Sequence, residues 1–269
     1  MRFFLFFLPI VLLAGCAPPA IAPDAHIPDF AKKPYEPFSR DAVVQIALRE
    51  WRLFGQMVDD DPPDSRPPPS PTAKPERWTG LWQRVGEYWW LGLNATAPEV
   101  SWTGKHDAFG AEFPAAQDGD YAWSAAFISY VMRIAGAGPR FPYTASHWEY
   151  IDRARQMVDA PGNGWVITAE RVEAYAPLPG DLICMGRGRA HDLRYEDLPA
   201  GPYPAHCDIV VQAESGQLAV VGGNVDDAVT LKHIPVTPDG KLATPDGKVV
   251  DERYPWMVVL RLLVPAPIS

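Results

Sequence analysis

Residues 121–135 read YAWSAAFISYVMRIA and predict a helix at the centre of the molecule. Between Ala125 and Ile134, apolar side chains occupy nearly all sides of the expected helix. A helix that is apolar all round is buried among other elements rather than laid on a surface. Gly136 follows and marks a plausible end, because glycine readily adopts the conformation that terminates a helix. We therefore expect the fold to be built around this segment.

Helical periodicity also precedes this segment. Apolar spacing predicts a helix over 40–58, capped by Ser39, and a second helix over 78–89. The Ser-x-x-Glu pattern at 146–149 is a capping box and predicts a further helix that runs to about Met157.

A different periodicity begins near residue 180. Short β-prone runs bounded by Gly, Pro, Asp and Asn occur at 182–185, 209–211, 218–221, 229–231 and 256–260. Helices followed by strands are typical of the α+β class. The sequence therefore predicts an α+β fold in which N-terminal helices pack on an antiparallel β-sheet.

The N-terminus has the pattern of an export signal. One charge, Arg2, precedes the apolar run 3–13, which is shorter than the roughly 20 residues of a membrane span. Residues 13–16 read Leu-Ala-Gly-Cys and resemble the cleavage box of bacterial lipoproteins. This predicts a signal peptide at 1–15 and a lipid on Cys16. An ordinary signal peptide and a buried N-terminal helix are the alternatives.

Prolines indicate how the rest of the chain is divided. Of the 30 prolines, six fall within 17–38 and seven within 62–75, and neither segment has helical apolar periodicity. We interpret 16–38 as the lipidated cysteine with its tether. The next part, 39–77, is an amphipathic helix with a Pro-rich excursion, and 78–269 is a single α+β domain.

Composition excludes several classes of function. The formal net charge is −9, and no cluster of Lys or Arg offers an electrostatic footprint for nucleic acid or an anionic membrane surface. The chain has no glycine-rich phosphate loop and no His-Glu-x-x-His or paired Cys-x-x-Cys motif, so we expect no cofactor and no metal. Two weaker alternatives are a metal at His191, His206 and Asp208, and a glycosidase-like carboxylate pair from Glu87, Glu112 and Asp120.

Ser124 stands in the first turn of the central helix, where a hydroxyl has a chemical use. Backbone N–H groups there have no helical acceptor and would stabilise an oxyanion formed beside Ser124. His206, at the start of a predicted strand, would accept the Ser124 proton, and Asn224 on the next strand would hold the other imidazole nitrogen. Taken singly, each residue also has an ordinary structural explanation.

Four short motifs, in this order, resemble the CHAP and NlpC-type amidases. They are Trp123 to Phe127, Pro179-Gly180-Asp181, the strand that contains His206, and Gly223-Asn224. Members of that superfamily are papain-like cysteine peptidases and amidases that cut amide bonds in bacterial cell-wall peptides. Over about residues 78–262 the chain resembles a bacterial lipoprotein family of unknown function allied to them. The resemblance implies a papain-like fold and peptidoglycan, or a related cell-wall peptide, as partner.

The nucleophile of that superfamily is a cysteine, whereas the matching residue here is Ser124. A hydroxyl does not ionise near neutral pH, so it depends on a general base. The resemblance implies either a serine-dependent amidase or endopeptidase, or an inactive protein that binds peptidoglycan or another protein. In the first case Ser124 is the nucleophile, His206 the base and Asn224 its orienting residue. The presence of all three favours catalysis.

Three further residues are alternatives for these roles. Tyr121 is a possible second oxyanion donor, because a Tyr shortly before the nucleophile resembles NlpC-type members. Asp208 lies on the same strand face as His206 and competes with Asn224. His147 competes as the base, although its place beside a capping Ser favours packing at a helix start.

The remaining two cysteines also bear on the compartment. Cys184 and Cys207 lie on predicted neighbouring strands and are a candidate disulfide in an oxidising compartment, with two buried free thiols as the alternative. With the export signal, we expect a bacterial cell-envelope protein that is anchored by lipid at Cys16. It would face the periplasm, at the outer membrane.

Overall fold

The computed structural model describes residues 37–264, apart from residues 64, 66, 68, 108 and 110. The predicted signal peptide, the lipidation site Cys16 and the tether through Glu36 lie outside the described residues. The described residues form one compact unit. Within the described ranges, no helix is both long and apolar enough to cross a bilayer.

Four α-helices form in the described part of the chain: α1 (Arg40–Leu53), α2 (Leu81–Gly92), α3 (Ser124–Ile134) and α4 (His147–Asp159). Short 3₁₀ helices lie at Pro71–Ala73, Pro75–Arg77, Pro98–Ser101, Ala115–Tyr121, Gly138–Arg140, Pro161–Asn163, Gly188–Ala190 and Tyr195–Asp197. Every residue of α3 from Ser124 to Met132 is buried. The all-round apolar pattern of this segment is explained by its central position.

α1 ends earlier than its periodicity predicts. Ser39 caps its start, since the Ser39 hydroxyl accepts the Ala42 N–H at 3.1 Å. The helix stops at Leu53 rather than at residue 58, because Gly55 (φ 87°) and Gln56 (φ 60°) adopt the left-handed conformation.

α2 likewise begins later than predicted, at Leu81 rather than at residue 78. Gly80, with φ 93°, precedes it and breaks the helical conformation. At its other end Gly92 allows α2 to approach α3 closely, since a Cβ there would lie 2.7 Å from the Ala126 carbonyl oxygen.

The sheet is antiparallel throughout, which confirms the predicted α+β class. Its strands are β1 (Ile167–Glu170), β2 (Leu182–Gly186), β3 (Ala205–Glu214), β4 (Gln217–Val225), β5 (Ala228–Pro235) and β6 (Trp256–Leu262), in the order β1-β6-β2-β3-β4-β5. Five of these strands contain the predicted β-prone runs. Strand β1 was not predicted, because Ile167-Thr168-Ala169-Glu170 is short and ends in a charge.

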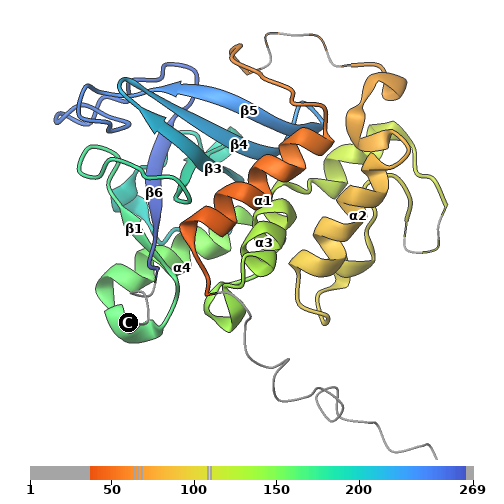
Figure 1. Cartoon of the computed structure of the whole chain (residues 1–269), viewed down its shortest axis with the longest axis horizontal. Coiled ribbons are helices and arrows are strands. Elements are labelled where there is room, and N and C mark those ends of the chain that lie inside the picture. The colour runs from red at the N-terminus through yellow and green to blue at the C-terminus, as the bar shows by residue number, and fades with distance from the viewer. Residues whose placement is uncertain are drawn as a thin grey trace, which may run out of the picture. The chain divides into compact units, whose positions relative to one another are not determined.

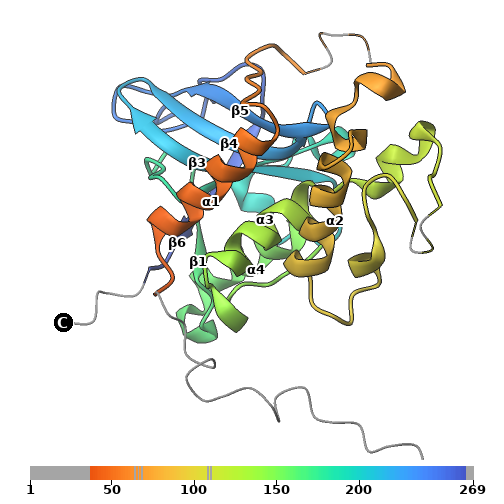
Figure 2. The ribbon, with the colours of Figure 1, turned by 45° about the vertical axis from the view of Figure 1, so that its right-hand side comes forward.

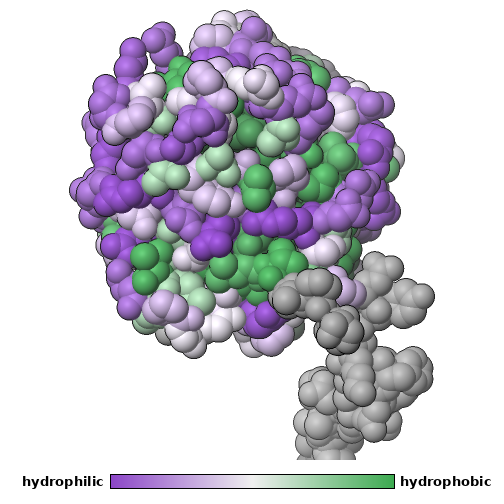
Figure 3. Space-filling view, turned by 60° about the vertical axis from the view of Figure 1, so that its left-hand side comes forward, coloured by the Kyte–Doolittle hydropathy of each residue, from purple (hydrophilic) through white to green (hydrophobic). Residues whose placement is uncertain are grey.

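The helices lie together against the sheet (Figures 1 and 2). α1 and α3 pack on β3 and β4, α2 packs on α3, and α4 packs on β1 and β3. A second, smaller apolar cluster, which includes Ile183, Val210 and Trp256, is separate from the large core. On the face shown in Figure 3, apolar residues form small groups separated by hydrophilic ones.

Two buried carboxylates join α1 to the rest of the fold. Glu50 is fully buried and accepts hydrogen bonds from Arg84 Nε at 2.6 Å and from the Tyr88 hydroxyl at 2.8 Å, both on α2. Asp181, of the Pro-Gly-Asp motif, pairs at 2.7 Å with Arg40 from the first turn of α1. The acidic residue of that motif is therefore a structural anchor.

Candidate functional site

Ser124 is the first residue of α3, and its hydroxyl contacts His147, the alternative base. Ser124 Oγ lies 2.6 Å from Nε2 of His147, which is the first residue of α4. Both side chains are buried, since Ser124 is 8% exposed and His147 is 5% exposed. The N-termini of α3 and α4 therefore lie next to each other.

The second ring nitrogen of His147 sets the direction of this hydrogen bond. His147 Nδ1 contacts the hydroxyl of Tyr150, one turn further along α4. Burial, with a contribution from His206, holds the pKa of His147 well below its ordinary value, so the imidazole is neutral near pH 7. Burial also raises the pKa of Tyr150, so the phenol keeps its proton. When Nδ1–H donates to the Tyr150 oxygen, Nε2 is available to accept the Ser124 proton.

A second imidazole, that of His206 on β3, lies beside this pair. The ring centroids of His147 and His206 are 5.3 Å apart. His206 Nε2 lies 3.0 Å from Asp208 Oδ1, and Asp208 Oδ2 lies 2.7 Å from Nζ of Lys232 on β5. His206, Asp208 and Lys232 are each no more than 3% exposed. The site thus contains a buried His-Asp-Lys row next to the Ser-His pair.

The pKa values of Asp208 and His206 in this row are both lowered. Burial would raise the pKa of Asp208, but the charges of Lys232 and His206 outweigh it and lower that pKa. Burial lowers the pKa of His206, and the opposing influence of Asp208 does not restore it. Because Asp208 is ionised, it accepts the Nε2–H of His206, which leaves Nδ1 of that ring with a lone pair.

Asn224 does not make the contact with the His206 ring that its predicted role requires. It lies at the bulge that follows Gly223, with φ 56°, and is half-buried. Between described residues, no hydrogen bond joins the Asn224 amide to Ser124 or His206. The structure therefore brings Asp208, rather than Asn224, to the His206 ring.

The two glycines before Asn224 are explained by close approaches. A Cβ on Gly222 would lie 2.0 Å from Asp208 Oδ1, and a Cβ on Gly223 would lie 2.6 Å from the Phe127 side chain on α3. Any larger side chain at Gly222 would displace the carboxylate that holds His206.

Tyr121 takes part in aromatic packing. Its ring stacks on Phe113 with centroids 4.2 Å apart and meets Trp102 edge-on at 5.1 Å. In the part of the chain that the structure describes, no hydrogen bond joins Tyr121 to Ser124.

The pairing of Ser124 with His147 depends on how α4 begins. Ser146 is the residue before the helix, but its side chain makes no capping hydrogen bond. Glu149 instead accepts the Thr144 hydroxyl at 2.6 Å, so the predicted capping box is not formed. The feature of the sequence that indicates this contact is a histidine at the start of a helix.

Cys184 and Cys207 form a disulfide between directly opposed residues of β2 and β3. Because adjacent residues of a strand point to opposite faces, the disulfide lies on the face away from His206. It ties together the two strands that position His206 and Asp208.

Sequence reasoning missed a charged cluster beside Ser124. The indole N–H of Trp123 donates to Glu76 at 2.6 Å, and Glu76 is 3% exposed. Lys74 lies nearby and pairs with Asp118 at 2.9 Å and with Asp227 at 3.3 Å. Burial, reinforced by Asp227 and Asp118 against the Trp123 hydrogen bond and Lys74, raises the pKa of Glu76 to about 8. No sequence motif links these dispersed residues.

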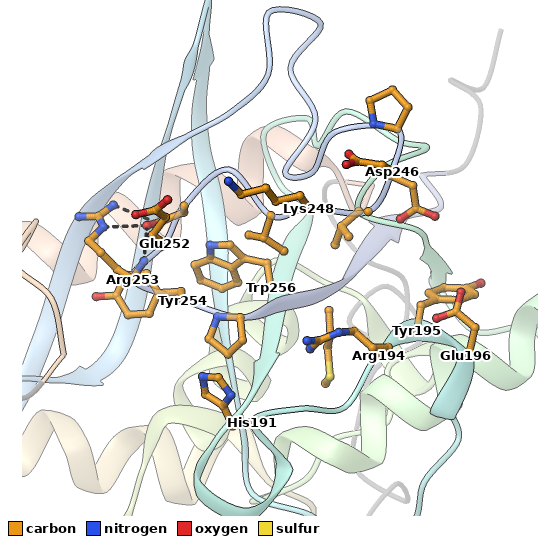
Figure 4. Close-up of a pocket in the computed structure, with 18 residues that line it drawn as sticks. His191, Arg194, Tyr195, Glu196, Asp246, Lys248, Glu252, Arg253, Tyr254 and Trp256 are labelled. Carbon is orange, nitrogen blue, oxygen red and sulfur yellow. Dashed lines mark hydrogen bonds and ion pairs between the residues drawn. The ribbon is translucent and has the colours of Figure 1, made fainter.

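A hollow of about 670 Å³ lies beside the smaller apolar cluster (Figure 4). Residues 191–196 and 245–257 supply most of its wall. Tyr254 and Trp256 line it, and their ring centroids lie 4.7 Å and 5.8 Å from Lys232 Nζ. The same ammonium therefore lies close both to two residues of the hollow's wall and to Asp208. Between residues 37 and 264, gaps excepted, no group of three or more His, Cys, Asp or Glu side chains is arranged to hold a metal ion.

Residues 76–262 match a protein family described as an uncharacterized protein conserved in bacteria (DUF2272). Because this match covers more than half of the chain, the protein belongs to that family. No curated protein and no solved structure shows a significant match to the chain.

Proposed function

We propose that the protein is a serine-dependent hydrolase of amide bonds in peptidoglycan or a related cell-wall peptide, with a papain-like fold. The observation that carries the proposal is the 2.6 Å contact between Ser124 Oγ and the neutral imidazole of His147. A serine at a helix N-terminus that is hydrogen-bonded to a neutral imidazole has the two parts that an activated hydroxyl nucleophile needs.

In the proposed reaction Ser124 Oγ attacks the amide carbonyl while its proton passes to His147 Nε2. The resulting imidazolium is held by its Nδ1–H at the Tyr150 oxygen, and the Ser124 backbone N–H stabilises the oxyanion. Collapse of the tetrahedral intermediate breaks the C–N bond, and His147 returns the proton to the leaving amine. Water then cleaves the acyl-Ser124 ester by the same route, which restores the free hydroxyl.

His206 has a supporting role in this proposal, in place of the base role that the sequence predicts. Its ring lies next to His147, and Asp208 fixes its tautomer with a lone pair on Nδ1. It would thus help to orient His147 and water during turnover.

The proposed location rests on the sequence. Cleavage before Cys16 and lipidation of that cysteine would anchor the protein at the outer membrane of the bacterial envelope, facing the periplasm. Peptidoglycan would then lie within reach of the tether. Globomycin sensitivity and palmitate labelling of the wild type, both absent in Cys16→Ala, test this part.

The reaction is tested with a fluorophosphonate probe and purified peptidoglycan. We expect covalent labelling and release of soluble peptide fragments by the wild type, with both lost in Ser124→Ala and strongly reduced in His147→Gln. Ser129→Ala is the matched control: Ser129 lies on the same helix, is buried, and donates to the Thr144 carbonyl at 2.9 Å. Labelling that persists in Ser124→Ala would falsify the nucleophile assignment.

Binding without turnover is the second candidate function. The observation that favours it is the 8% exposure of Ser124, which restricts access to the hydroxyl. It predicts that the wild type sediments with insoluble peptidoglycan, releases no fragments, and binds equally well as Ser124→Ala.

A further inference from the structure

Arg187 follows β2 directly and continues its extended backbone. Its φ and ψ are −122° and 154°, and its N–H donates to the Pro204 carbonyl at 2.9 Å, which extends the β2–β3 ladder by one residue. Met185 pairs with His206 and Gly186 pairs with Ala205. The backbone therefore fixes where the Arg187 side chain begins.

The same ladder places Arg187 and His206 on one face of the sheet. Cross-strand partners share a face and residues alternate along a strand, so Arg187 lies on the face of Met185 and hence of His206. Diagonal neighbours of this kind are about 7–8 Å apart, which a long side chain can span. In agreement, the positive charge of Arg187 contributes to lowering the pKa of both His147 and His206.

Arg187 is exposed, and no carboxylate among the described residues lies within ion-pair distance of its guanidinium. The segment that follows it is held in place. Asp152 on α4 accepts the Gly201 N–H at 2.9 Å and the Tyr203 hydroxyl at 3.2 Å. The backbone that carries Arg187 is therefore held in place, and its guanidinium is a cation near the two imidazoles that pairs with no described carboxylate.

We propose that Arg187 forms a carboxylate-binding subsite beside Ser124, so that the protein takes peptides with a free carboxylate next to the amide bond. A guanidinium binds a carboxylate through two parallel N–H···O hydrogen bonds, which fixes orientation as well as position. On a chain of net charge −9, an unpaired arginine at this place also gives an acidic peptide one local point of attraction. The inference rests on the proposed function, because it assigns the substrate class of the same site.

Two capped tripeptides that differ by one charge test the subsite: N-acetyl-Ala-Glu-Ala-amide and its Gln counterpart. Each is measured for direct binding to the full-length protein by calorimetry, and for its ability to slow fluorophosphonate labelling of Ser124. We expect the wild type to favour the Glu peptide about tenfold in both measurements. The ratio falls to about one in Arg187→Ala and takes an intermediate value in Arg187→Lys.

Arg189→Ala is the matched control. Arg189 is an exposed arginine two residues further on, and its guanidinium donates to the Pro202 carbonyl at 3.2 Å. A preference for the Glu peptide that survives in Arg187→Ala, or falls equally in Arg189→Ala, overturns the proposal, and so does an equal affinity of the wild type for both peptides. Absence of labelling in the wild type contradicts the proposed hydrolase instead, since calorimetry still reports the charge preference.

Discussion

Lys232 Nζ lies 2.7 Å from Asp208 Oδ2, and the two side chains are 1% and 0% exposed. The ammonium also lies within 6 Å of the ring centroids of Tyr254 and Trp256. Removing two charges from water is costly, and their mutual attraction compensates only while both are present. The His206 side of the site therefore depends on a lysine from a strand that carries no recognisable motif.

Lys232→Met is expected to lower the free energy of unfolding by about 3–5 kcal/mol, because it leaves the buried Asp208 carboxylate without its cation. Urea unfolding measures the change. In the double variant Lys232→Met/Asp208→Asn the loss is expected to be smaller than in the single variant. Lys241→Met, which removes a partly exposed lysine whose ammonium pairs with the exposed Asp239, is the control and should change little. A double variant as unstable as the sum of the single variants would contradict the pairing.

Gly222→Ala is expected to cost about 1–3 kcal/mol of stability, because its Cβ competes for space with the Asp208 carboxylate. The variant should also change the ¹⁵N chemical shifts of the His206 ring, since Asp208 sets its tautomer. Gly119→Ala provides the comparison, since a Cβ there meets no atom within 4 Å. Unchanged His206 shifts in Gly222→Ala would contradict this account of the glycine.

Glu76→Gln is expected to stabilise the protein at pH 8 but not at pH 4. Below the ordinary pKa of 4.5 the carboxyl is protonated in both the folded and the unfolded chain. As the pH rises from 4.5 to about 8, only the unfolded chain ionises, so the wild type loses stability over that interval while the glutamine variant does not. At about 1.36 kcal/mol per pKa unit, the shift from 4.5 to about 8 sets an upper limit of about 5 kcal/mol on the growth of this difference. Glu112→Gln, at an exposed carboxylate of the same region, should show no such growth.

Reduction of the Cys184–Cys207 disulfide is expected to lower stability by about 3 kcal/mol, according to the chain-entropy estimate for a loop of this size. Urea unfolding with and without reductant measures the loss. The variant Cys184→Ala/Cys207→Ala should be insensitive to reductant. Detection of both thiols in denatured but unreduced protein would show that the bridge is absent.

Local patterns predicted much of the fold. Apolar periodicity located the central helix and five of the six strands. The helix boundaries at Leu53 and Leu81 were misplaced because Gly55, Gln56 and Gly80 adopt left-handed conformations that periodicity does not register. These errors change the lengths of the elements but not the class of the fold.

The candidate site was less predictable, because its pairings depend on where distant elements meet. Ser124, His206 and Asp208 were all identified, and the alternation of strand residues indicated that His206 and Asp208 share a face. The contact of Ser124 with His147 joins the first residues of two helices. The register of the sheet cannot predict that approach, and the Ser-x-x-Glu pattern favoured a capping role for the same position.

The buried carboxylates described above also affect where the protein can be cut. The family match begins at residue 76. Within α1, however, Glu50 accepts a hydrogen bond from Arg84, and Arg40 forms an ion pair with Asp181. Both of these partners lie inside the matched region. A recombinant fragment trimmed to 76–262 would leave the partly buried Arg84 without Glu50 and the buried Asp181 without Arg40. It would also expose the apolar surface that Val43 and Ala47 cover. The smallest autonomous folding unit of this protein therefore includes α1, and fragments for biochemical work should start at or before Pro37.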